Sequence, residues 1–142
     1  MIDSKIVSYL KENDEFELLP EYKEKFLAIL LDAGINKSSA LIDLMANYSG
    51  EFNGNEGFII NVADDLSDYE NSVIKILREE EGVPNFYLSL FNFEFDDYLL
   101  YNIENDNVVL IEGGNIEKLK NNDFTKKWNN FNDFLLDFFE LN

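Results

Sequence analysis

The chain has 142 residues, of which 29 are Asp or Glu and 11 are Lys or Arg, so its formal net charge is −18 at pH 7. It contains no Cys and no His, which excludes disulfides, thiolate chemistry and the side chain most often used as a general base. A surface with this charge repels nucleic-acid phosphates and anionic lipid, and it attracts cationic partners.

The composition predicts one folded domain over residues 1–142. Hydrophobic residues make up 46% of the chain and aromatic residues 15%, which is too much apolar surface for a disordered acidic tail. No stretch approaches the ~20 apolar residues of a membrane span, and the N-terminus lacks the basic and apolar pattern of a secretory signal. We therefore expect a cytoplasmic protein that does not insert into membranes.

The first half of the chain predicts three helices. Apolar residues recur at helical spacing over residues 2–10 and predict a short helix. A second helix is expected just after Pro20 and ends at Gly34, because proline is common at the start of a helix and glycine at its end. Ser38 or Ser39 caps a third helix over residues 39–48. Residues 49–57 contain three Gly and two Asn and are typical of a loop.

The second half predicts strands and two further helices. Residues 58–62 form a buried strand, and Ser67 with Glu70 makes a capping box for a helix that ends at Gly82. Strands are expected at residues 86–95, 98–103 and 108–111, the last two joined as a hairpin by the polar turn at residues 104–107. After a polar connector, Asn130 caps a closing helix with an apolar stripe of Phe and Leu.

This order of elements predicts an α+β fold. We expect a mostly antiparallel sheet, with N-terminal helices and a C-terminal helix packed on one face of it. No repeat or linker divides the chain.

Catalytic and metal-binding motifs are not found in the sequence. Asp64, Asp65 and Asp68 lack the ligand spacing of a calcium loop, and no phosphate-binding loop or nucleophile elbow is present. Pairs of carboxylates could run glycoside hydrolysis, but 29 acids produce such pairs by chance. We expect no enzyme, no cofactor and no metal.

Three groups of acids could contact a cationic partner. Glu79, Glu80 and Glu81 end a helix, where the macrodipole disfavours acids, so they indicate either a partner contact or a frayed end. Asp133, Asp137 and Glu140 share one helix face, as a contact surface or as a solvated face. The third group surrounds the predicted hairpin, with tyrosines as rigid anchors beside steering carboxylates. We predict that it binds the partner: Asp96, Asp97, Tyr98, Tyr101, Glu104 and Asp106.

The C-terminal half resembles the SUKH superfamily, also called Smi/Knr-type proteins. The resemblance lies in YLSLFNFEFDDYLLYNIENDNVVLIEG followed by WNNFNDFLLDFFE: a hairpin, a polar connector, a Trp and a closing F-x-x-F-L helix. The PEYKEKFLAIL segment is similar to the family's early helix. The matching positions are Tyr98, Leu100, Tyr101, Val108, Trp128, Phe131, Phe134 and Leu135.

The resemblance implies a non-enzymatic α+β domain. Bacterial members are commonly immunity proteins that bind and block a polymorphic toxin, and fungal members are linked to cell-wall glucan synthesis. We therefore expect a protein-binding domain, monomeric or weakly dimeric, that neutralises a cognate basic nuclease-type toxin by covering its active surface. The alternative is a regulator or scaffold of glucan synthesis. A carboxylate-based hydrolase is a third hypothesis, and it requires a carboxyl with a displaced pKa in a cleft.

Overall fold

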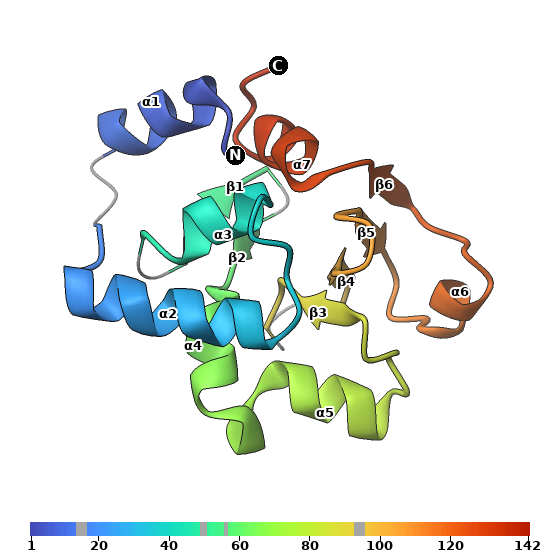
Figure 1. Ribbon diagram of the computed structural model, residues 1–142. Coiled ribbons are helices and arrows are strands. Elements are labelled where there is room, and N and C mark those ends of the chain that lie inside the picture. The colour runs from blue at the N-terminus through green and yellow to red at the C-terminus, as the bar shows by residue number, and fades with distance from the viewer. Residues whose placement is uncertain (14–16, 49–50, 56, 93–95) are drawn as a thin grey trace.

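The computed structural model describes residues 1–13, 17–48, 51–55, 57–92 and 96–142. Within these ranges the chain forms seven α-helices, one short 3-10 helix and six strands (Figure 1). The strands make a two-stranded and a four-stranded antiparallel sheet. The arrangement confirms the α+β prediction. No helix in these ranges has the length and apolar character needed to cross a bilayer.

Three N-terminal helices confirm the sequence prediction. They are α1 (Ser4–Glu12), α2 (Pro20–Asp32) and α3 (Ala40–Met45). The side chain of Ser39 accepts a hydrogen bond from the Leu41 amide and so caps α3. The third helix is shorter than the predicted range 39–48, and α3 ends at Met45.

The prediction of a loop at residues 49–57 was wrong over the part that the structure describes. Here β1 (Phe52–Gly54) pairs with β2 (Gly57–Ile59), while residues 49, 50 and 56 lie outside the described residues. Phe52 and Ile59 are opposite each other and fully buried, and their burial stabilises a hairpin whose glycines alone suggest a loop.

A helix that the sequence analysis missed follows β2. The predicted strand 58–62 ends at Ile59, and Asn61 caps α4 (Val62–Ser67) by accepting from the amides of Ala63 and Asp64. The Asn61 side chain also donates to the carbonyl oxygens of Met45 and Tyr48. One buried amide therefore joins the start of α4 to the end of α3.

The predicted capping box at Ser67 was also wrong. Ser67 ends α4, and its hydroxyl donates to the Asp64 carbonyl oxygen. The 3-10 helix η1 (Tyr69–Asn71) intervenes, and Ser72 caps α5 (Val73–Glu80) by accepting from the Lys75 amide at 3.0 Å. As predicted, this helix ends just before Gly82, which has the left-handed φ of 70°.

The four-stranded sheet has the order β3 (Tyr87–Ser89), β4 (Tyr98–Asn102), β5 (Val108–Ile111) and β6 (Lys126–Trp128). The β4–β5 hairpin confirms the prediction for residues 98–111. β3 covers part of the predicted strand 86–95, of which residues 93–95 lie outside the described residues. The polar connector also contains α6 (Glu117–Lys120) and the edge strand β6, neither of which was predicted.

Both faces of this sheet are covered, which corrects the expectation of helices on one face. Leu99 and Tyr101 of β4 point into the main core, built with α1–α4 and the closing helix α7 (Phe131–Phe138). The intervening Leu100 points the other way, into a smaller core with Leu77 of α5 and Leu119 of α6. Because alternate residues of a strand face opposite sides, four buried residues in a row require two cores.

The closing helix forms as the sequence predicts. Asn130 caps α7 by accepting from the Asp133 amide at 2.8 Å, and the apolar stripe faces the main core. Asp137 accepts from the indole Nε1 of Trp128 at 3.0 Å, while Glu140 lies beyond the end of α7. Of the predicted acidic face of this helix, Asp137 therefore makes an internal contact and Glu140 is not part of the helix. The stripe comprises Phe131, Phe134, Leu135 and Phe138, all buried.

Candidate functional site: an acidic groove beside β4

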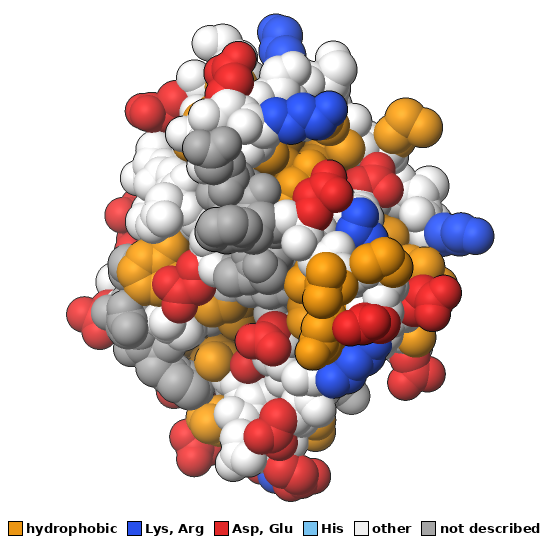
Figure 2. Space-filling model, turned by 90° about the vertical axis from the view of Figure 1, so that its left-hand side faces the viewer, with side chains coloured by type: hydrophobic (Ala, Val, Ile, Leu, Met, Phe, Trp, Pro, Cys, Tyr) orange, Lys and Arg blue, Asp and Glu red, His pale blue; other side chains and the backbone are white. Residues whose placement is uncertain are grey.

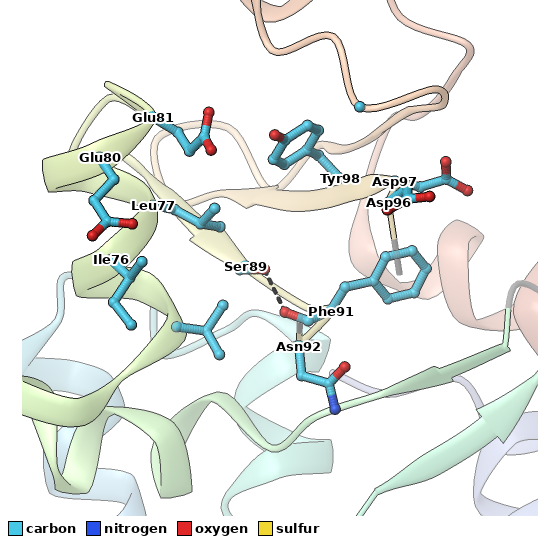
Figure 3. Close-up of a pocket in the computed structure, with 12 residues that line it drawn as sticks. Ile76, Leu77, Glu80, Glu81, Ser89, Phe91, Asn92, Asp96, Asp97 and Tyr98 are labelled. Carbon is cyan, nitrogen blue, oxygen red and sulfur yellow. Dashed lines mark hydrogen bonds between the residues drawn. The ribbon is translucent and has the colours of Figure 1, made fainter. Parts of the chain in front are cut away.

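A groove of about 360 Å³ opens between α5, the end of β3 and the start of β4 (Figure 3). We call it the acidic groove. Its floor is apolar and consists of Val73, Ile76, Leu77 and Phe91. Its rim carries Glu80 and Glu81 from α5 on one side, and Asp96, Asp97 and Tyr98 at the start of β4 on the other.

The end of α5 positions one rim, and a hydrogen bond within the β4–β5 hairpin positions the other. Gly82 ends α5 and leaves Glu80 and Glu81 beside the sheet. On the other rim, the carboxylate of Asp97 accepts from the Gly113 amide at 3.1 Å and so joins the start of β4 to the end of β5. Gly113 has a φ of 85°, a backbone conformation that glycine adopts without strain.

The phenol of Tyr98 reports the negative potential in the groove. Burial raises the pKa of Tyr98, and the charges of Glu81 and Asp96 raise that pKa further. In Figure 3, Glu81 and the Tyr98 hydroxyl point toward one another across the groove. Carboxylates from both rims therefore act on the same point, and their effect is to favour positive charge there.

The part of the groove lining that the structure describes offers its acids no counter-ion. None of the described residues that line it is Lys or Arg. Lys75, on α5, pairs with Glu70 at 2.6 Å and lies 4.0 Å from Glu79, while Arg78 donates to the Asn85 carbonyl oxygen at 2.8 Å. The nearest cations of α5 are thus engaged outside the groove.

The charge of the chain is distributed unevenly. The segment from residue 79 to residue 117 contains ten acids and no Lys or Arg, whereas five of the eleven cations lie in the first 37 residues. Figure 2 shows the face that carries α1 and α2, where basic side chains are interspersed with acidic ones. The groove therefore lies in the most negative part of the sequence.

The six residues predicted to bind a partner do not form one site. Asp96, Asp97 and Tyr98 lie on the rim of the groove. The other three lie at the far end of β4 and in the turn that follows it, roughly 15 Å away at the rise of a β-strand. Of these, Glu104 is exposed.

Tyr101 and Asp106 hold the fold together, which corrects their assignment as partner contacts. Tyr101 is only 1% exposed, and its hydroxyl donates to the Asp106 carboxylate. The same carboxylate accepts from the Ser39 hydroxyl at 2.6 Å and from the Phe131 amide at 3.0 Å. One side chain therefore links the cap of α3, the hairpin and the first residue of α7, and we call it the Asp106 hub.

Glu80 and Glu81 are the site residues that the partner prediction left out. At a helix C-terminus, where acids are unfavourable, they indicated either a partner contact or a frayed end, and the sequence pattern did not place them beside Asp96, 15 residues along the chain from Glu81. The absence of Lys and Arg between Arg78 and Lys118 is the sequence signal that could have joined them.

No metal centre is found in the part of the chain that the structure describes, where no group of three or more acids could hold an ion. Asp65, considered above as a ligand, accepts from the amides of Val73 and Ile74 at the start of α5. Burial raises the pKa of Asp65, these two hydrogen bonds lower it, and the charge of Asp64 raises it.

The chain matches no protein-family model, no curated protein and no solved structure. The similarity to the SUKH superfamily therefore stays a prediction from the sequence pattern.

The Asp106 hub predicts a clear difference between two acids of the hairpin. Asp106→Ala should lower the free energy of unfolding by about 1–3 kcal/mol, because it leaves buried donors unpaired. Asp106→Asn should cost less, because Asn keeps an acceptor oxygen and tolerates the φ of 66° at this position. Asp96→Ala, on the groove rim, should change it by no more than about 0.5 kcal/mol. Urea denaturation measures all three, and equal stability of the two Ala variants would contradict the hub.

The electrostatics of the groove can be measured without a partner. Glu81→Gln should lower the pKa of Tyr98, because it removes a charge that raises it. Glu104→Gln is a matched control, since Glu104 raises the pKa of Tyr87 instead. Titration of both tyrosines by ¹³C NMR should show each variant shifting only its own tyrosine. A Tyr98 pKa that is the same in Glu81→Gln would show that the two rims do not act on one point.

Proposed function

We propose that this chain is a non-enzymatic binding protein that docks its acidic groove onto a cationic protein. The partner that fits best is a basic, nuclease-type toxin domain, which the chain would neutralise as an immunity protein. One observation carries the proposal: carboxylates from two separate elements surround an apolar floor, and the described lining contains no cation.

Electrostatic complementarity gives the mechanism. A nuclease carries positive charge where it contacts phosphate, so an acidic protein that occupies the same surface blocks the substrate. Charge steering of this kind raises association rate constants to ~10⁸–10⁹ M⁻¹s⁻¹ at low salt. The apolar floor and Tyr98 supply desolvated contact area, which holds the complex after encounter.

Two further features support binding over catalysis. The resemblance to the SUKH superfamily implies a domain without enzymatic activity. The second feature concerns Asp65, a carboxyl whose pKa is raised by burial, as catalysis by a carboxyl would require. Its side chain accepts hydrogen bonds at the start of α5 and does not line the groove, so it does not supply a catalytic acid there.

The test is whether a toxin domain is encoded beside the chain's own gene and, if so, whether the chain neutralises it. Adding the purified chain should abolish the toxin's nuclease activity at a one-to-one ratio, and co-expression should restore growth. The variant Glu12→Gln/Glu24→Gln removes two charges from exposed positions on α1 and α2, away from the groove. It should still neutralise the toxin. If instead the gene lies in a wall-synthesis operon, and its deletion alters wall glucan without changing toxin sensitivity, the immunity proposal is wrong and the regulator alternative is favoured.

Salt should affect the complex and the free chain in opposite directions. Raising NaCl from about 0.05 M to about 0.5 M shortens the screening length, so it should weaken the complex markedly. The same salt should raise the Tm of the free chain, because it screens the repulsion among the excess carboxylates. Calorimetry of binding and of unfolding measures the two effects. A complex that is indifferent to salt would contradict docking by charge.

A further inference from the structure

We propose that the acidic groove admits one arginine side chain of the partner, with its aliphatic stem on the apolar floor and its guanidinium between the two acidic rims. This inference rests on the proposed function and names the group that the groove binds.

The floor of the groove fits an aliphatic stem. Val73 and Ile76 are half-buried, and Leu77 and Phe91 are almost fully buried. The hydroxyl of Ser89, which also lines the groove, donates to the Phe91 carbonyl oxygen at 2.7 Å, so it is already satisfied (Figure 3). The long side chains of Arg and Lys cover apolar surface of this kind while they keep their charged end outside it.

The rims fit a planar cation better than a compact one. Glu81 and Asp96 come from opposite sides, and both act on the phenol of Tyr98. A guanidinium presents five N–H donors in a flat fork and can pair with more than one carboxylate, whereas an ammonium is a point charge with stronger hydration. The ring of Tyr98 adds an aromatic surface on which a guanidinium can stack.

The size of the groove limits its occupant. About 360 Å³ is near the lower end of the ~300–1,000 Å³ typical of small-ligand sites. This space suits one side chain and its hydration better than a helix or a strand. Anionic ligands are disfavoured, because the described lining offers four carboxylates and no cation to receive them.

The experiment compares three peptides that differ in one side chain. Ac-Gly-Arg-Gly-NH₂, its Lys analogue and its citrulline analogue are titrated into ¹⁵N-labelled protein at low salt, and amide shifts are followed by NMR. Citrulline has nearly the shape of arginine but no charge. We expect shifts at Leu77, Tyr98 and Gly114, strongest with Arg, weaker with Lys and absent with citrulline.

Two variants with equal net charge locate the effect. Glu81→Gln/Asp96→Asn should weaken binding of the Arg peptide by about tenfold or more, the loss expected when charge-assisted hydrogen bonds are removed. Glu12→Gln/Glu24→Gln should leave it within about twofold, because exposed charges on α1 and α2 interact with the groove only weakly through water. The spectra of the free variants show whether each remains folded.

Several outcomes would overturn the inference: equal binding of the citrulline peptide, equal binding of the Lys peptide, shifts centred outside the groove, or equal weakening by both variants. The inference and the proposed function can fail separately. A toxin that binds in a salt-sensitive way, but equally well to the groove variant, refutes the arginine site and leaves the immunity role standing. A groove that binds the Arg peptide in a chain that neutralises no toxin refutes the immunity role alone.

Discussion

The burial of β4 on both faces determines how the two cores, and with them the helices, are arranged. This strand pairs with β3 on one side and β5 on the other, and its side chains alternate between two cores. The main core fixes α7 and α3 against it through Tyr101, and the smaller core brings α5 against it through Leu100 and Leu77. The two ends of the strand consequently have different roles, because one joins the Asp106 hub and the other forms a rim of the acidic groove.

The carboxylates that give the chain its charge of −18 fall into two kinds. Carboxylates that stabilise the fold are those that accept hydrogen bonds from the backbone or from buried side chains, as Asp65 and Asp106 do. Glu80, Glu81 and Asp96 on the groove rim are different, since their repulsion opposes folding and no Lys or Arg in the described lining offsets it. A cationic partner would relieve that repulsion, so the feature that costs stability in the free chain is the feature that favours binding.

Local patterns in the sequence predicted most of the fold. The stripe of α7, the proline at the start of α2 and the hairpin of β4 and β5 are signals contained within a few neighbouring residues. The errors came where tertiary contacts override local signals: the glycines near residue 54 suggested a loop but accompany a buried strand pair, and Ser67 resembled a helix cap that Ser72 provides. Half of the predicted partner residues line the groove. Tyr101 and Asp106 were wrong because the exposure of a tyrosine, and the hydrogen bonds of a carboxylate, depend on elements distant in sequence, while Glu104 stays a prediction.

In the proposed function, negative charge at the groove, and not negative charge in general, recruits a cationic protein. The most direct measurement is the rate constant with which the chain associates with its proposed cationic partner, followed by stopped flow over a range of ionic strengths. Wild type is compared with a groove variant and an α1–α2 variant of identical net charge. We expect a slower and less salt-dependent association for the groove variant alone. Identical rates and salt slopes for the two variants would contradict that expectation.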